Sequence, residues 1–409
     1  MTIPQAISIA DYTYELPAKR IAEFPAEPRD SSRLLVYDPA EGLPYGDIFS
    51  KLPDYLPANS LIYFNETRVV QARLIFHKES GARIEIFCLS PVTPGPLAEQ
   101  AFASLGPVIW KTYVGNAKRW KTGTLKMPFQ TGKGQTGNLT AEITGRNGNT
   151  FFVRFAWEPM GLTFSDVLEA TGKIPLPPYI RRDVLPGDRI TYQTVYARTN
   201  GSVAAPTAGL HFTDNIINEL KNKNIQPQQL VLHVGAGTFK PVESDDVSNH
   251  TMHTEEIIVS RKTIEALAEG INQPKIVVGT TSVRTLESLY QTGRKLTEGI
   301  PFEKAVHTCQ WDPYGSARPE PVQAIEAIMR HMKKHNLESL NGSTNLMIVP
   351  GYRFMLTDLL LTNFHQPHST LLLLVAAFCG EGWKKAYQYA LDNGFRFLSY
   401  GDACLFAKA

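Results

Sequence analysis

Apolar and polar residues alternate strictly through much of the region 66–155, and this pattern predicts short, half-buried strands. The clearest alternating segments are 82–89 (ARIEIFCL), 139–145 (LTAEITG) and 149–157 (NTFFVRFAW). Successive side chains of a strand point to opposite faces, so a period of two indicates one buried face. Glycine-rich turns (GKGQTGN and GRNGN) separate the segments. Short strands joined by such turns are typical of a small β-barrel.

The rest of the chain mixes buried strands with helical periods. Apolar runs at 275–280 and 345–350 predict strands, and a 3.6-residue period predicts helices at 165–172, 213–224, 260–272, 321–336 and 381–394. Ser165, Thr213 and Ser260 are expected N-caps, while Gly172 and Gly394 stand where glycine ends a helix. We therefore expect a mixed α/β (α+β) body, residues 1–65 and 156–409, interrupted by an inserted β-barrel domain at 66–155.

Length and composition exclude several classes of protein. With 409 residues, 43% hydrophobic and 20% charged, the chain is neither disordered nor small enough to need disulfides. The longest apolar run, 371–379, is too short to span a membrane. The N-terminus carries no signal-peptide pattern and the four cysteines form no CxxC pair, so we expect a cytoplasmic protein. No long apolar patch demands a partner subunit, so we expect a monomer.

The net charge of +2 conceals two unlike parts. The region 66–155 carries twelve basic and five acidic residues, a net of +7, so the remainder carries −5. Residues 100–141 include no acid at all, but six basic residues with Trp110, Tyr113, Trp120 and Phe129 among them. Basic groups attract phosphates and exposed rings stack on unpaired bases, so the barrel is expected to contact nucleic acid. The alternative is a solvated barrel face whose rings belong to the core.

Two glycine- or threonine-rich turns follow predicted strands. The segment 230–239 (LVLHVGAGTF) looks superficially like a methyltransferase cofactor motif, but no helical period follows it, as such a motif requires. The segment 279–288 (GTTSVRTLES) opens a helix, and a helix N-terminus with Arg284 in its first turn favours an anion. A plain strand–turn–helix connection is the alternative. No Walker A lysine is present.

Two further polar loops carry candidate functional residues. The first, 204–212 (AAPTAGLHF), ends near His211, and the second places Asn363, His365 and His368 before an apolar helix capped by Ser369 or Thr370. Small and polar loops beside apolar elements are typical walls of a cleft. The histidine pairs 250/253, 331/335 and 365/368 match no metal motif, so no metal is expected. The residues alone thus indicate an α/β enzyme that contacts nucleic acid, without giving the reaction.

Longer strings identify a resemblance that covers nearly the whole chain. They are FNETRVVQARL (64–74), PLPPYIRR (175–182), GSVAAPTAGLHFT (201–213), LHVGAGTFKPV (232–242), GTTSVRTLES (279–288), PGYRFMLTDLLLTNFHQPHSTLLLLVAAF (350–378) and FRFLSYGDACLF (395–406). With them the chain resembles the S-adenosylmethionine:tRNA ribosyltransferase-isomerases of the queuosine pathway. Two departures occur: the family's Asn-Asp-Thr-Arg reads Asn-Glu-Thr-Arg at 65–68, and its Arg-Pro-Gly run is replaced at 113–116.

The resemblance implies a two-domain protein with an inserted barrel and an uncommon use of S-adenosylmethionine. The ribosyl group, rather than the methyl group, moves onto 7-aminomethyl-7-deazaguanine at the wobble position of the tRNA anticodon loop. Epoxyqueuosine-tRNA forms, and adenine and methionine leave. S-adenosylmethionine is consumed as a substrate, and no further cofactor is implied.

This chemistry needs a general base that removes a ribose 5′ hydrogen, which the adjacent sulfonium acidifies. A group titrating near neutrality suits the step, so histidine is expected. His211 and His233 are the first candidates because they stand at loop edges in the most family-specific strings, and His365 is the third. Carboxylates are the other option, with Asp402 and Glu255 as candidates.

The substrate's other groups suggest further roles. Thr280, Thr281 and Arg284 are expected to bind the methionine carboxylate, and Tyr352 or Tyr400 to face the sulfonium. The remaining substrate-binding candidates are residues of the loops described above, Thr207, Gly235, Gly237 and Asn363. Phosphates that flank the splayed target base would meet the basic residues Lys111, Lys118, Arg119 and Lys121.

Two rival functions remain open at the level of sequence. A methyltransferase would use the same cofactor but release S-adenosylhomocysteine. An RNA-binding barrel on an inert α/β scaffold would bind tRNA without consuming the cofactor.

Overall fold

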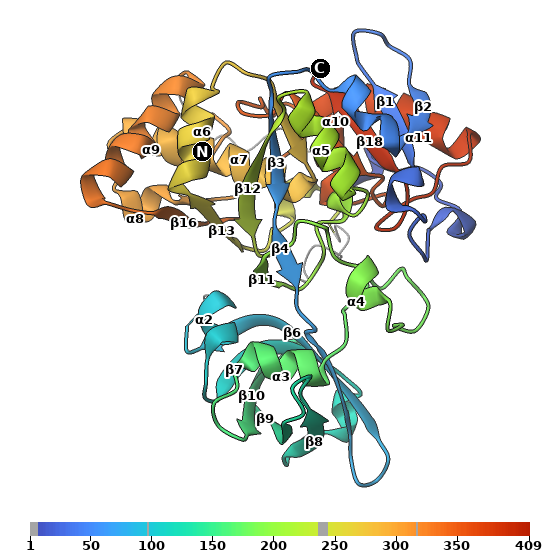
Figure 1. Cartoon of the computed structure of the whole chain (residues 1–409), viewed down its shortest axis with the longest axis vertical. Coiled ribbons are helices and arrows are strands. Elements are labelled where there is room, and N and C mark those ends of the chain that lie inside the picture. Colours follow the sequence, from blue (N-terminus) through green and yellow to red (C-terminus); the bar gives the residue numbers. More distant parts are fainter. Residues whose placement is uncertain (1–6, 96–97, 236–243, 316–317) are drawn as a thin grey trace.

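The computed structural model describes residues 7–95, 98–235, 244–315 and 318–409. It contains two bodies, a larger one built on a ten-stranded mixed sheet and a smaller six-stranded antiparallel barrel (Figure 1). The expected fold class is therefore confirmed. Among the described residues, no helix combines the length and apolar character needed to cross a bilayer.

The large sheet has a parallel centre, and its flanks contain both parallel and antiparallel pairs. In spatial order its strands are β15 (His307–Thr308), β16 (Ser339–Thr344), β13 (Glu255–Ser260), β12 (Gln226–Leu232), β3 (Leu61–Asn65), β14 (Lys275–Val278), β17 (Leu359–Asn363), β18 (Ala403–Ala407), β1 (Arg33–Tyr37) and β2 (Tyr45–Ile48). The neighbours β12, β3, β14 and β17 all run parallel. Their carboxyl ends consequently meet at one edge of the sheet.

Both faces of this sheet are buried, which explains the continuous apolar runs of its strands. Leu61 and Tyr63 of β3 join the core on one face, and Ile62 and Phe64 join the core on the other. The first face packs against α6 (Arg261–Glu269), α7 (Thr280–Thr297), α9 (Pro321–His335), α10 (Thr370–Cys379) and α11 (Gly382–Asp392). The second face packs against α1 (Leu52–Tyr55) and α5 (Asp214–Asn222), while α8 (Phe302–Ala305) precedes β15.

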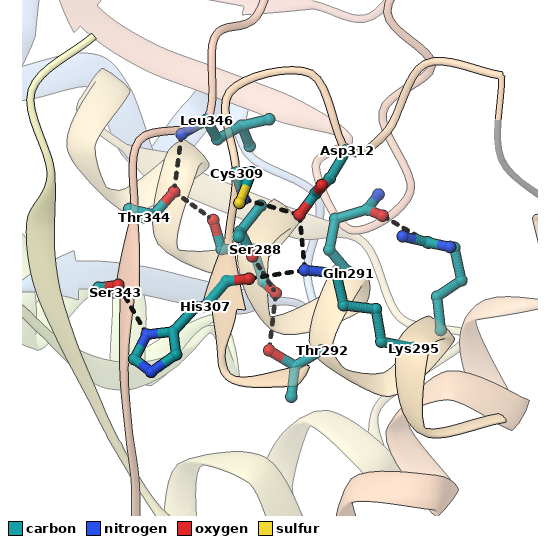
Figure 2. A network of polar contacts seen from close by, with 12 residues as sticks. Ser288, Gln291, Thr292, Lys295, His307, Cys309, Asp312, Ser343, Thr344 and Leu346 are labelled. Carbon is teal, nitrogen blue, oxygen red and sulfur yellow. Dashed lines mark hydrogen bonds and ion pairs between the residues drawn. The ribbon is translucent and has the colours of Figure 1, made fainter. Parts of the chain in front are cut away.

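The helix α7 is buried over nearly its whole length, although many of its residues are polar. Figure 2 shows how its polar side bonds to β15, to the turn after β15 and to β16. Lys295 Nζ donates to Asp312 Oδ2 at 2.5 Å and to the carbonyl of His307 at 2.6 Å. Ser288 Oγ donates to Thr344 Oγ1 at 2.7 Å. These bonds fix the helix whose first turn forms part of the site described below.

The barrel follows the large sheet's third strand in the chain. In spatial order its strands are β5 (Arg73–His77), β6 (Arg83–Thr93), β7 (Val108–Gly115), β10 (Thr150–Glu158), β9 (Thr136–Asn147) and β8 (Leu125–Gln130), with β5 and β8 approaching each other. The short helices α2 (Ala98–Ala103) and α3 (Phe164–Thr171) pack on its core. The parallel pair β4 (Thr67–Val69) and β11 (Thr199–Ser202) lies between the two bodies, and α4 (Asp188–Thr191) lies beside it (Figure 1).

The barrel core extends beyond residue 155, where the expected insert ends. β10 continues to Glu158, and Phe164, Val167 and Leu168 of α3 belong to the same hydrophobic cluster as the barrel strands. The barrel therefore shares one core with residues up to 168.

Three local expectations are wrong. Residues 345–350 form no strand, because their N–H groups bond elsewhere: that of Leu346 donates to Thr344 Oγ1 and that of Val349 to Tyr314 Oη. The N-cap of α3 is Thr163 rather than Ser165, since Thr163 and Asp166 form a reciprocal capping box. Gly172 is not in the left-handed region that usually ends a helix, but Gly394 is, with φ +79°. The predicted helices and the caps at Thr213 and Ser260 are confirmed.

The aromatic residues of the acid-free stretch do not form stacking platforms. Trp110, Trp120 and Phe129 lie in the barrel core, where each is less than 10% exposed, and Tyr113 alone is half-buried. Trp110 on β7 and Phe129 on β8 occupy inward strand positions, and Trp120 enters the core from the turn between these strands, as the alternative interpretation of this stretch required.

Candidate functional site

A cleft opens at the edge of the large sheet where the parallel strands β12, β14 and β17 end. Its walls are Val234, the first turn of α7, residues 362–366 at the end of β17 and just after it, and the loop 204–208. Three more distant segments complete the wall with Tyr179, Ser369, Leu371, Leu398 and Ser399. It encloses about 760 Å³ of empty space, its opening included. Ligands of open α/β sheets bind at such strand ends.

Five of the expected site residues line this cleft although they come from three separate loops. They are Thr207, Thr280, Thr281, Asn363 and His365. The helix α7 starts here behind Gly279, whose φ of +87° turns the chain from β14 into the helix. The N-cap residue Gly279 has no side chain to cap α7, so among the described residues the N–H groups of its first turn are open to an anion.

His365 is the one candidate base in the cleft wall. It is half-buried, and its Nε2 lies 2.9 Å from Thr362 Oγ1. Its backbone is fixed on both sides, since its N–H donates to Tyr387 Oη at 3.0 Å and its carbonyl accepts from Tyr14 Oη. Burial lowers the pKa of His365 to about 3, so the ring is neutral at pH 7. The unprotonated ring in the wall can accept a proton, but the lowered pKa makes it a weaker base than an ordinary histidine.

The other two candidate histidines lie outside the wall. His211 is buried behind Asn363, and burial together with the charges of Arg396 and Arg29 lowers its pKa to about 3. His233 is buried against Gly201, and burial lowers its pKa to about 4. Neither imidazole reaches the cleft.

The glycines expected to approach the substrate are only partly described. Gly235 follows Val234, which lines the cleft, and no atom lies close to where a Cβ would stand on it. Gly237 lies outside the residues that the structure describes.

Two expected charged site residues neutralise each other away from the cleft. Arg284 is buried, its Nε donates to the carbonyl of Leu346 at 3.0 Å, and its Nη1 pairs with the carboxylate of Glu255. Burial raises the pKa of Glu255, but the charges of Arg284 and His253 outweigh it and hold the value at about 2. Glu255 is thus a weak base, and the charge of Arg284 is already balanced.

Three further candidates are also engaged outside the cleft. Tyr352 Oη donates to Glu287 Oε2 at 3.0 Å, and Tyr400 Oη donates to Asp188 Oδ1 at 3.3 Å. The carboxylate of Asp402 accepts the backbone N–H groups of Arg33 and Arg396 at 3.1 and 2.7 Å, and Arg396 also pairs with it. These groups hold loops together rather than facing a ligand.

The cleft also contains polar residues that sequence reasoning missed. Tyr179 and Ser399 both line it, and their hydroxyl groups are 2.5 Å apart. Gln366 and Ser369 line it as well. All four stand in strings quoted for the family resemblance, but nothing in their local spacing distinguishes them from neighbours that point elsewhere.

Comparison with known proteins identifies the family. A model described as "Queuosine biosynthesis protein" matches residues 9–406. The chain belongs to this family. It is 36% identical over 411 residues to the S-adenosylmethionine:tRNA ribosyltransferase-isomerase of Azoarcus sp. (strain BH72), with 98% of each chain covered. It is 38% identical over 402 residues to the protein of that name from Anaeromyxobacter sp. (strain K), covering 97% of this chain and 98% of the relative.

One solved structure is also similar to this chain. It is the S-adenosylmethionine tRNA ribosyltransferase of Thermotoga maritima, 28% identical, with a TM-score of 0.46 and 97% of this chain and 99% of that chain covered. The relatives in this family carry the name of an enzyme, and this chain is an enzyme of the same family.

Three of the four basic residues expected to contact tRNA lie at one turn of this family member's barrel. Lys118 and Arg119 belong to a short 3₁₀ helix, Ala117–Arg119, and Lys121 follows it; all three are exposed. Lys111 lies on β7 and is half-buried. The turn therefore presents three cations to solvent, with the ring of Trp120 turned into the core between them.

Proposed function

We propose that the protein transfers and isomerises the ribosyl group of S-adenosylmethionine onto 7-aminomethyl-7-deazaguanine at the wobble position of tRNA. Epoxyqueuosine-tRNA, adenine and methionine are the products. The observation that carries the proposal is the cleft itself, which sets a neutral histidine beside the uncapped N-terminus of a buried helix. The names of the relatives supply the substrates.

The proposed reaction begins with proton transfer to a residue of the cleft wall. His365 accepts the ribose 5′ proton, and the electron pair left on carbon is stabilised by the adjacent sulfonium as an ylide. The sugar ring then opens, and adenine leaves with the proton that His365 removed. The amine of the modified base attacks and gives up one proton, and methionine departs with the electron pair of its carbon–sulfur bond as the carbon skeleton closes. His365 replaces His211 and His233 as the proposed base, because it alone of the three lines the cleft.

Two further groups suit the charged ends of the substrate. The N–H groups of Thr280 and Thr281 at the start of α7 bind the methionine carboxylate, aided by the helix dipole. The ring of Tyr179, rather than those of Tyr352 and Tyr400, faces the sulfonium, because it lines the cleft. S-adenosylmethionine is consumed, and no other cofactor takes part.

The barrel turn at 117–121 supplies contacts to tRNA phosphates, and Lys111 adds a fourth cation on β7. Single-stranded anticodon bases can be splayed out, which brings the modified base into the cleft. We further propose a cytoplasmic monomer. All four cysteines lie in the described part and are unpaired, as expected in a reducing compartment.

One incubation tests the reaction. The full chain is mixed with S-adenosylmethionine and tRNA carrying 7-aminomethyl-7-deazaguanine, and the small products are separated by chromatography. Adenine and methionine in equal amounts are expected. S-adenosylhomocysteine would instead identify a methyltransferase, and tRNA binding without any consumption of S-adenosylmethionine would identify a binding protein.

A further inference from the structure

A chain of three buried polar side chains leads from the interior of the body to the wall of the cleft. Ser32 Oγ lies 2.8 Å from His211 Nδ1, and His211 Nε2 lies 3.1 Å from Asn363 Nδ2. The three residues are 2, 4 and 2% exposed. Only Asn363, at the end of β17, belongs to the cleft wall. His211 is thus held between a hydroxyl on one side and an amide on the other.

The surroundings of Asn363 decide which way its amide points. Its Nδ2 also lies 3.5 Å from the carbonyl oxygen of Asp402, which can only accept a hydrogen bond. The amide must therefore turn its N–H groups, rather than its oxygen, toward Asp402 and His211. His211 Nε2 consequently accepts from Asn363, and its Nδ1–H donates to Ser32 Oγ. One neutral tautomer of His211 satisfies both contacts.

This arrangement leaves one polar atom without a partner. Asn363 Oδ1 is buried and accepts no hydrogen bond among the described residues. A buried acceptor without a partner is costly, and such atoms in native structures call for an explanation. Asn363 forms the cleft wall together with Thr362 and His365. A ligand bound in the cleft would supply the donor that Oδ1 lacks.

The same contacts argue against proton transfer by His211. Both ring nitrogens are occupied by neutral partners, and Phe49 lies against the ring with the centroids 5.0 Å apart. The ring is separated from the cleft by Asn363. A proton arriving at Nε2 would also break the bond that orients the amide.

We propose that His211 is a positioning residue, which with Ser32 orients the Asn363 amide so that Oδ1 accepts a hydrogen bond from an amino or hydroxyl group of bound S-adenosylmethionine. The inference rests on the proposed function only for the identity of the ligand. It adds Ser32 to the functional residues and moves His211 from proton transfer to substrate orientation.

Two substitutions of His211 separate positioning from proton transfer. In His211→Gln the side-chain oxygen can take the place of Nε2 and accept from Asn363, but the amide cannot act as a base. His211→Leu fills the space and offers no acceptor. We expect His211→Gln to keep the KM for S-adenosylmethionine within about threefold of the unmodified enzyme, and His211→Leu to raise it about ten- to hundredfold. The kcat of His211→Gln should fall far less than that of a variant lacking its base.

The measurements are adenine release with tRNA, and S-adenosylmethionine binding without tRNA by calorimetry. The same pair of substitutions at His335, exposed in the last turn of α9, is the control and should change neither. If His211→Gln loses activity as completely as His211→Leu, the positioning role is wrong. If both variants bind and react like the unmodified enzyme, the orientation of Asn363 is irrelevant and the inference also fails.

Ser32→Ala keeps the test decisive if His211→Leu does not fold. Removing the hydroxyl frees His211 to rotate or to change tautomer, so the KM for S-adenosylmethionine should rise while the pH profile of kcat/KM keeps its shape. An unchanged KM would contradict the proposal. Failure of the proposed function is separate, because the unmodified enzyme would then release no adenine at all.

Discussion

Arg284 and Glu255 form an ion pair inside the body, with side chains only 6 and 1% exposed. The pair joins the start of α7 to β13, and Arg284 also bonds the carbonyl of Leu346 after β16. Arginine in the first turn of a helix suggested an anion site from sequence. In the structure its charge is balanced by Glu255 instead, so Arg284 is not available to the anion proposed at this helix start.

Breaking this pair should destabilise the fold. Arg284→Met or Glu255→Gln leaves the other charge buried, which costs about 3–5 kcal/mol of unfolding free energy. The double variant should lose less than the sum, because neither charge remains. Urea denaturation checks both statements. The exposed pair Arg330 and Glu326 on α9 is the control, and its removal should cost less than about 1 kcal/mol.

The same pair predicts how stability depends on pH. Burial raises the pKa of Glu255, but the charges of Arg284 and His253 stabilise the carboxylate more strongly. The pKa in the folded state is therefore about 2, below its ordinary 4.5. A carboxylate with a lowered pKa stabilises the fold above its unfolded pKa and stops doing so as the pH falls toward the folded value. The stability advantage of the unmodified chain over Glu255→Gln should therefore shrink between about pH 4.5 and 2. An advantage that stays constant over this range would assign the stabilisation to another group.

His365 is expected to be essential for the first chemical step. In His365→Gln adenine release should fall about 10²–10⁴-fold while S-adenosylmethionine still binds. Since the pKa of His365 is lowered to about 3 by burial, kcat/KM should be flat between pH 5 and 8 rather than fall below about 6.5. His368→Asn is the matched control, because His368 is exposed and its left-handed backbone, φ +56°, suits asparagine. Substantial adenine release by His365→Gln would remove His365 from the mechanism.

Neutralising the barrel turn should weaken tRNA binding selectively. Replacing Lys118, Arg119 and Lys121 by glutamine should raise the KM for tRNA and lower the salt slope of binding by about 0.7–0.9 per lost phosphate contact. The KM for S-adenosylmethionine should stay the same. Lys333 and Lys334, exposed on α9 at the far side of the body from the barrel (Figure 1), serve as the control. Equal salt slopes for both variants would exclude the turn from the tRNA site.

Gly172 follows α3 and packs closely against the backbone just before β5, so a larger residue there should destabilise the fold. A Cβ added at Gly172 would stand 1.8 Å from the backbone carbonyl oxygen of Gln71, so Gly172→Ala should destabilise the chain by about 1–3 kcal/mol or more. Gly187, just before α4, has a helical φ of −63° and open space around it. Gly187→Ala should therefore stabilise by about 0.4–1 kcal/mol. Thermal unfolding of the two variants should shift in opposite directions, and shifts of the same sign would contradict the packing argument.

The sequence determined those features that depend on spacing between neighbours in the chain. Alternation located the barrel strands β6, β9 and β10, and a 3.6-residue period located α3, α5, α6, α9 and α11. Thr213 and Ser260 marked helix starts because a cap bonds groups within its own turn. The charge distribution and the family strings are likewise properties of the chain itself. Local spacing predicted the wrong structure where tertiary hydrogen bonds replace those of a sheet. Residues 345–350 are largely apolar, as in a strand, but the N–H groups of Leu346 and Val349 bond to side chains.

The tertiary structure alone decided which polar residues face the cleft. Tyr179 and Ser399 meet across 220 positions, Ser32 meets His211 across 179, and Arg284 meets Glu255 across 29. Tyr352, Tyr400 and Tyr179 all stand in the family strings. The hydroxyl groups of Tyr352 and Tyr400, however, bond to Glu287 and Asp188 outside the cleft. A buried polar group must find a partner wherever the fold brings one, and no local pattern encodes that choice.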